Sequence, residues 1–264
     1  MSFSSGVKEE LAKHISSARH CQIAELSAMM HYIGQYGMDK DGNLTIGFQT
    51  ENEAVIRKCF TLLKKTYNID TEMISDKKQI EQVLKKFGNL DEPVSPLILR
   101  NSCCQRAFLR GAYLCIGSMS DPEKSYHLEF VCTDSQKAEQ LKAVIKGFDI
   151  DARIVLRKKY FVVYIKEGSG IVDLLNVMEA HISLMELENL RIVKEMRNSI
   201  NRRVNCEAAN ITKTVNASSR QIEDILLIRD RYGFQKLSEP LRQMAEVRLE
   251  YPEAALKELS LIHI

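Results

Sequence analysis

Two helices with apolar residues on nearly every side are the clearest pattern in the first half of the chain. Residues 24–34 (AELSAMMHYIG) and residues 107–117 (AFLRGAYLCIG) resemble each other, and they end at Gly34 and Gly117. A helix without a polar face needs cover on more than one side, so we expect these two helices to pack together. Gly111 has no Cβ and permits close approach of the two backbones. The terminal glycines are expected to take the left-handed conformation that ends many helices.

A strand and an amphipathic helix are expected after each apolar helix. The segments 46–70 and 128–151 align, with Phe48 and Phe130 separated by 82 positions. Asn52 and Asp134 are the predicted N-cap residues of the two helices. The apolar stripes consist of Val55, Phe60, Leu62 and Leu63 in the first helix, and of Ala138, Leu141, Val144 and Ile145 in the second. The chain therefore contains an internal duplication.

The two copies differ after this helix. In the second copy, residues 153–165 predict two strands joined by a basic turn, and a flexible Gly-Ser-Gly turn at 168–170 leads to a helix starting at Ile171. The first copy is shorter by about ten residues, roughly one strand of the hairpin. The fold class is therefore α+β, with duplicated α/β units that carry small antiparallel sheets. The basic residues of the hairpin, Arg153, Arg157, Lys158 and Lys159, suit contacts to a nucleic-acid backbone and equally suit a solvated turn.

The remainder of the chain predicts an all-helical domain. Leucines recurring at threes indicate a helix from His181 to about Ser199, which an asparagine-rich segment separates from a second helix over 208–231. Ser238 is the expected N-cap of a third helix. The predicted organisation is a first repeat at 1–95, a second at 96–185, a connecting helix or linker at 186–205, and a helical DNA-binding domain at 206–264.

Positive charge is concentrated in this last part. The whole chain has a net charge of +2, whereas residues 191–220 contain seven basic and two acidic residues and sum to +5. Such a segment is typical of phosphate binding, although a solvated helix face has the same composition. The candidate DNA-binding residues are Arg191, Arg197, Arg202, Arg203, Lys213, Asn216 and Arg220, since basic side chains bind phosphates and asparagine can read adenine.

Other classes of function find little support in the sequence. The seven cysteines include no CxxC pair, so reduced buried thiols are favoured over a zinc site. No P-loop, GxGxxG or GxSxG motif is present, and neither a cofactor nor a small-molecule substrate is expected. No membrane span or signal peptide is evident, so we expect a cytoplasmic protein without membrane association.

A duplicated helix that ends in glycine and leads into a strand resembles the LAGLIDADG homing-endonuclease fold. More closely, residues 107–130 and 196–225 resemble the WhiA family of sporulation and cell-division regulators. That resemblance implies a LAGLIDADG-like domain followed by a helix-turn-helix domain that binds double-stranded DNA at the nucleoid. It also implies roles in transcription control, cell division and chromosome segregation. The recognition helix is expected beyond Ile264, which would leave the domain incomplete.

The resemblance also argues against catalysis. Active LAGLIDADG nucleases carry an acidic residue before the terminal glycine of each helix, where two carboxylates hold divalent cations. Ile33 and Ile116 occupy those positions here. The nearest acids, Asp39, Asp41 and Asp121, are expected to serve turns. Two alternatives stay open: a protein-interaction scaffold with a protein partner, and a site-specific endonuclease.

Overall fold

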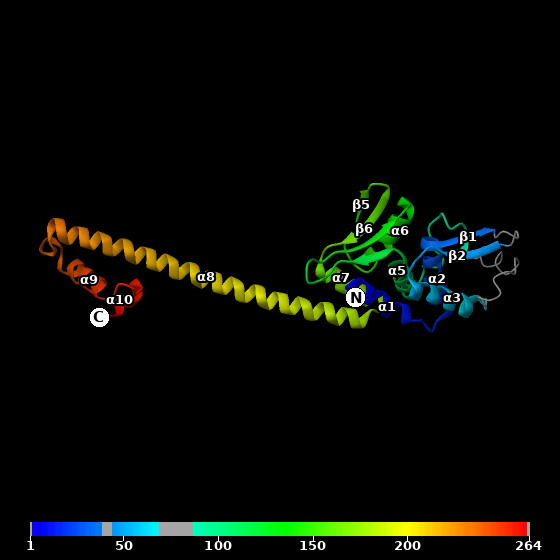
Figure 1. Cartoon of the computed structure of the whole chain (residues 1–264), viewed down its shortest axis with the longest axis horizontal. Helices are drawn as coiled ribbons and strands as arrows, with labels where there is room; N and C mark the ends of the chain where they lie inside the picture. Colours follow the sequence, from blue (N-terminus) through cyan, green and yellow to red (C-terminus); the bar gives the residue numbers. More distant parts are fainter. Residues whose placement is uncertain (1, 39–43, 69–86, 263–264) are drawn as a thin grey trace. The chain divides into compact units, whose positions relative to one another are not determined.

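A computed structural model describes residues 2–38, 44–68 and 87–262. The chain forms two compact units, Met1–Ile192 and Val193–Ile264. The first contains both repeats, and the second is helical (Figure 1).

The centre of the first unit is a pair of helices, α2 (Arg19–Ile33) and α5 (Ser102–Ile116). Leu26 and Met29 of α2 and Phe108 of α5 are completely buried, which confirms that both helices are covered on several sides. Helix α1 (Phe3–Lys13) packs against the same core through Val7 and Leu11. The two apolar helices therefore form the predicted central interface of the repeats.

The helices approach each other at Gly111. A Cβ placed there would lie 2.5 Å from the carbonyl oxygen of Glu25 and 3.0 Å from the Cβ of Ala28. Gly111→Ala is therefore expected to push α2 and α5 apart and to lower the free energy of unfolding by about 1–3 kcal/mol. Chemical denaturation measures this loss, and Gly6→Ala, where the added Cβ meets no atom within 4 Å, is the matched control. Equal stability of the two variants would refute the close approach.

The expected conformation of the two terminal glycines is wrong. Gly34 has φ −69° and ψ 138°, and Gly117 has φ −82° and ψ 148°, so both are extended. Each glycine also begins a strand directly after its helix. A Cβ at either position would approach the preceding helical turn to 2.4 Å, at the Met30 carbonyl oxygen or the Tyr113 ring. Space, rather than a left-handed backbone, requires glycine at these positions.

The duplication is confirmed by the strand pairing. Strand β1 (Gly34–Met38) pairs with β2 (Leu44–Phe48), and β3 (Gly117–Met119) pairs with β4 (Leu128–Cys132). Gly34 lies opposite Phe48, and Gly117 lies opposite Phe130, so the equivalent residues of the two copies make equivalent pairs.

The predicted helix starts are also confirmed. Helix α3 (Glu53–Tyr67) begins at Asn52 and α6 (Ser135–Lys146) begins at Asp134, and each of these side chains accepts two backbone N–H groups. The predicted apolar stripes face the core, with Phe60 half-buried and the other seven residues buried.

The second repeat has a four-stranded antiparallel sheet with the order β3-β4-β6-β5. Strands β5 (Arg153–Arg157) and β6 (Tyr160–Ile165) form the predicted basic hairpin. Helix α7 spans Gly168–Met178, so the Gly-Ser-Gly segment is its first turn and not the expected flexible loop. The shortening predicted for the first repeat falls on residues 69–86, outside the described residues.

A buried group of charged side chains joins the two repeats. The Glu25 carboxylate on α2 lies 2.5 Å from Lys58 Nζ on α3 and 3.2 Å from Arg110 Nε on α5, and all three side chains are at most 2% exposed. Arg110 also donates to Glu179 at the end of α7 and to Ser16. Burial lowers the pKa of the Lys58 ammonium, and the Glu25 carboxylate opposes this effect. The guanidinium of Arg110 thus links α5 to α2, to the end of α7 and to the segment that follows α1.

A buried histidine is expected to make the stability of the first unit dependent on pH. The ring nitrogens of His31 lie 2.9 Å from the Glu92 carbonyl oxygen and 3.2 Å from that of Phe87. Burial is the main cause that lowers the pKa of His31 below its ordinary value. Folding therefore favours the neutral ring. The contribution of this ring to the free energy of unfolding is complete above pH about 6.5 and is lost as the pH falls through the pKa of the folded state.

We expect the free energy of unfolding to fall between pH about 7.5 and about 5.5 by more in the unchanged chain than in His31→Gln. Denaturation at both pH values measures the difference. The same pH dependence in both proteins would exclude this histidine as the cause.

One helix replaces the expected interrupted pair in the C-terminal part of the chain. Helix α8 runs without a break from His181 to Tyr232, through the asparagine-rich segment. Asparagine costs a helix only about 0.7 kcal/mol relative to alanine, whereas glycine and proline, the stronger breakers, are absent from this stretch. The short 3₁₀ helix η2 (Phe234–Lys236), α9 (Glu239–Glu250) and α10 (Leu256–Ile262) complete the unit. Ser238 is the N-cap of α9, although its side chain accepts no capping hydrogen bond from the helix.

Candidate nucleic-acid interface

The part of α8 in the second unit has one basic face. Arg202, Lys213 and Arg220 are separated by eleven and seven residues, which correspond to about three and two helical turns. They therefore lie along one line of the helix, and Asn216 lies beside it, one turn before Arg220. All four side chains are exposed. The arrangement is a linear set of three cations with one amide, suited to following a row of phosphates.

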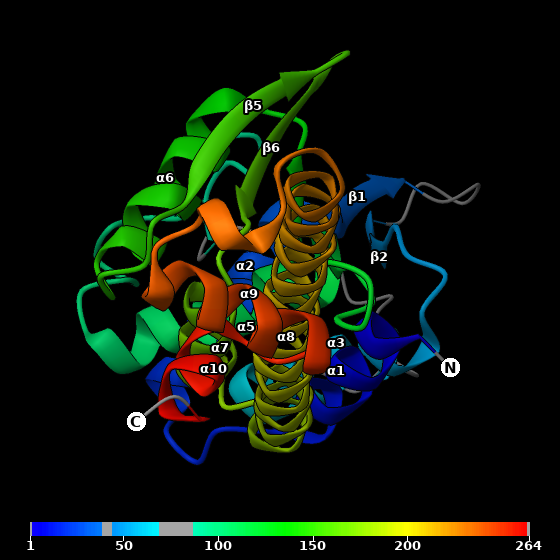
Figure 2. The same ribbon diagram turned by 90° about the vertical axis from the view of Figure 1, so that its left-hand side faces the viewer.

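The opposite face of α8 is apolar and packs against the last two helices near its end. Ser218 donates a hydrogen bond to the carbonyl oxygen of Pro252, in the connection between α9 and α10. The buried Arg248 of α9 donates to the Ala254 carbonyl oxygen at 2.5 Å and to Ser218 Oγ at 3.4 Å. Figures 1 and 2 together show α9 and α10 beside this end of α8. Because this packing uses the apolar face, it leaves the basic face accessible to a ligand.

The other candidates on α8 do not join this face. Arg197 and Arg203 are exposed, but their positions place them on other sides of the helix. Arg191 belongs to the first unit, where its guanidinium donates to Glu188 at 2.8 Å. Of the seven predicted residues, the structure therefore gathers four on one surface, which we call the α8 basic face: Arg202, Lys213, Asn216 and Arg220.

The basic hairpin of the second repeat is partly neutralised. Arg157 lies 3.0 Å from Glu129 on β4 of the same sheet, and Arg153 lies 3.3 Å from Asp151. Lys158 and Lys159 form the turn itself, where Lys158 has a left-handed φ of 55°. The Lys159 ammonium lies 5.4 Å from the centre of the Tyr160 ring. The hairpin thus offers two exposed lysines at its tip and two arginines that already have acidic partners.

The helix ends that hold metal ligands in LAGLIDADG nucleases carry aliphatic side chains. Ile33 is the last residue of α2 and is buried, and Ile116 is the last residue of α5 and packs half-buried against the same core. Neither has an atom that can coordinate a cation. Asp121 serves a turn, as predicted, because its carboxylate accepts the Glu123 N–H. Asp39 and Asp41 lie outside the described residues.

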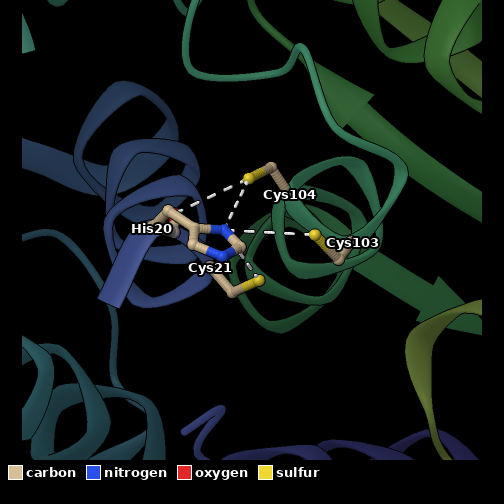
Figure 3. A group of neighbouring side chains, drawn as sticks. All are labelled: His20, Cys21, Cys103 and Cys104. Carbon is tan, nitrogen blue, oxygen red and sulfur yellow. Dashed lines mark hydrogen bonds between the residues drawn. The ribbon is translucent and has the colours of Figure 1, made fainter. Parts of the chain in front are cut away.

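A second group of polar side chains, which the sequence analysis missed, lies at the opposite ends of α2 and α5. His20, Cys21, Cys103 and Cys104 place their ligand atoms within 4.8 Å of one another (Figure 3). All seven cysteines are free thiols, but Cys103 and Cys206 are exposed, so the expectation of buried thiols was wrong for these two. The signal that could have revealed the group is the repeat itself, since Cys103 and Cys104 follow His20 and Cys21 by the same 83 residues that separate Gly34 from Gly117.

Comparison with known proteins finds three models of one family that match successive parts of the chain. Residues 19–87 match the WhiA N-terminal LAGLIDADG-like domain, residues 105–197 the WhiA LAGLIDADG-like domain, and residues 200–263 the WhiA C-terminal HTH domain. No described helix has the length and apolar character to cross a bilayer.

Curated relatives match over nearly the whole chain. The Probable cell division protein WhiA of Lachnoclostridium phytofermentans is 53% identical over 98% of this chain and 91% of its own length. The protein of the same name from Alkaliphilus oremlandii is 45% identical over 98% and 89%. Among solved structures, full-length DUF199/WhiA from Thermotoga maritima is similar with a TM-score of 0.64 and 26% identity, over 98% of this chain and 90% of that one.

Proposed function

The chain belongs to the WhiA family, and from this premise we propose that it is a DNA-binding regulator without nuclease activity. We propose that it acts at the nucleoid in the cytoplasm, in the control of transcription, cell division and chromosome segregation. Its relatives are called probable cell division proteins, and one of its three domain matches is a helix-turn-helix domain.

The α8 basic face is the observation that carries this proposal. It lies within the part of the chain that matches the helix-turn-helix domain, and its four side chains are exposed while the apolar face packs on α9 and α10. Arginine and lysine at helical spacing bind backbone phosphates, and Asn216 beside them suits contact with an adenine edge. Lys158 and Lys159 at the hairpin tip are proposed as additional backbone contacts, and Arg197 and Arg203 as weaker ones.

A binding titration tests this proposal. Fluorescence anisotropy of a labelled duplex, measured with the full chain at a low and a high salt concentration, is expected to show binding that weakens strongly with salt, because neutralised phosphates release counterions. No binding at low salt would overturn the proposal.

A parallel incubation of plasmid with Mg²⁺ or Mn²⁺ addresses nuclease activity. Because Ile33 and Ile116 provide no oxygen ligands, we expect the plasmid to stay intact. Plasmid cleavage that EDTA abolishes would instead support the hypothesis of a site-specific endonuclease.

A protein partner is the second candidate, and one observation favours it. Part of the apolar face of α8 in the second unit is exposed, with Met196 60%, Ile200 49% and Ile211 64% accessible. Apolar residues at helical spacing that remain exposed are typical of a surface covered by another protein. A regulator of this kind can bind DNA through one face of α8 and a protein through the other.

A further inference from the structure

The cluster of His20, Cys21, Cys103 and Cys104 joins the first turns of two helices that are far apart in sequence. His20 and Cys21 lie in the first turn of α2, and Cys103 and Cys104 lie in the first turn of α5. Because the two pairs occupy equivalent positions in the two repeats, the pairing of α2 with α5 brings them face to face. Figure 3 shows all four side chains directed into the same space.

The distances from the histidine nitrogen to the three sulfur atoms suit a tetrahedral metal site. His20 Nδ1 lies 3.2 Å from Cys104 Sγ, 3.4 Å from Cys21 Sγ and 4.0 Å from Cys103 Sγ. A tetrahedral zinc ion with a Zn–N bond of about 2.0 Å and Zn–S bonds of about 2.3 Å separates nitrogen from sulfur by about 3.5 Å. The three distances bracket this value.

Hydrogen bonding alone accounts poorly for this arrangement. An imidazole nitrogen has either one proton or one lone pair, so His20 Nδ1 can form a good hydrogen bond with only one of the three thiols. A cation at the centre would satisfy all four groups at once. Three cysteines and one histidine are also one of the usual ligand sets of structural zinc.

The surroundings suit a soft cation. Cys21 and Cys104 are 6% and 3% exposed and pack with Ala24 and Ala107 in a small apolar cluster. His20 and Cys103 are exposed, which leaves a path for a metal to enter.

We propose that His20, Cys21, Cys103 and Cys104 form a structural site for one zinc ion, which fastens the start of α2 to the start of α5. The site lies at the ends of α2 and α5 opposite to Ile33 and Ile116, and it has no part in nuclease chemistry. Its role is to lock the two repeats together, so its loss would loosen the LAGLIDADG-like domain while leaving the α8 basic face intact.

Metal binding by the full chain tests the site. The reduced, chelator-treated protein is titrated with Zn²⁺ against a chromophoric chelator, and with Co²⁺ to record the intense d–d bands of tetrahedral thiolate coordination. We expect one equivalent to bind. We expect Cys103→Ser to weaken binding by about 100-fold or more, since a ligand is lost, and Cys206→Ser, which removes an exposed thiol from α8, to leave it unchanged.

Thermal unfolding separates loss of metal from loss of fold. Because Cys103 is exposed, Cys103→Ser without zinc is expected to melt at the temperature of the unchanged chain without zinc. Added zinc should raise the melting temperature of the unchanged chain and of Cys206→Ser only, by mass action. Three results would each overturn the proposal. They are unchanged zinc affinity in Cys103→Ser, no zinc binding by the unchanged chain, and a disulfide among these cysteines in the freshly purified protein.

Discussion

Glu25→Ala is expected to lower the free energy of unfolding by about 3–5 kcal/mol, because it leaves two buried cations without their shared partner. The Glu25 carboxylate contacts both Lys58 and Arg110 inside the first unit, where none of the three side chains is reached by water. Arg110 retains Glu179 and Ser16 after the change, whereas among the described residues Lys58 retains a hydrogen bond to the carbonyl oxygen of Leu11 alone. Chemical denaturation of the full chain measures the loss.

An exposed ion pair provides the control for this prediction. Glu53 and Arg57 lie one turn apart on α3 with 3.7 Å between their charged atoms, and both side chains are more than three quarters exposed. Glu53→Ala is expected to change the stability by no more than about 0.5 kcal/mol. Similar losses in the two variants would show that the buried network does not hold the repeats together.

The second large effect concerns DNA binding. Replacing Arg202, Lys213 and Arg220 together with alanine is expected to weaken duplex binding about 100-fold at low salt, on the basis of about 1 kcal/mol for each phosphate contact. The fold should be preserved, because these side chains are exposed and alanine favours helix. Fluorescence anisotropy measures the affinity, and far-ultraviolet circular dichroism verifies the helix content.

A charge-matched variant distinguishes a binding face from a general effect of charge. Lys65 on α3 and Lys146 on α6 are exposed, and Lys142 on α6 is half-buried. Replacing these three lysines with alanine removes the same number of positive charges from the first unit. We expect this variant to bind DNA nearly as well as the unchanged chain. If both triple variants lose affinity equally, the α8 basic face has no special role.

The features of the fold that could be predicted depend on local patterns or on the repeat. The N-caps Asn52 and Asp134, the close approach at Gly111 and the basic hairpin all follow from a few neighbouring residues or from the comparison of two copies. The prediction of a break in α8 at the asparagine-rich segment is wrong. Asparagine costs a helix little and the segment has neither glycine nor proline, so local propensity is compatible with one continuous helix.

The buried polar contacts could not be predicted because they join distant residues. Glu25 and Arg110 are 85 positions apart and meet only after both repeats have folded. The same is true of His20 with Cys104, which are 84 positions apart. The candidate residues on α8 follow from the concentration of positive charge and, for Asn216, from its amide, and the geometry of the continuous helix separates those that share a face from the others. Arg197 and Arg203 are as basic as Arg202, and only their place on the helix sets them apart.

The salt dependence of DNA affinity is the most direct test of the proposed DNA contact. A plot of the logarithm of the association constant against the logarithm of the salt concentration should have a slope of about −0.9 for each phosphate neutralised. Replacing Arg202, Lys213 and Arg220 with alanine should therefore reduce the slope by about 3. An unchanged slope would show that these side chains do not contact the phosphates and would contradict the proposed interface.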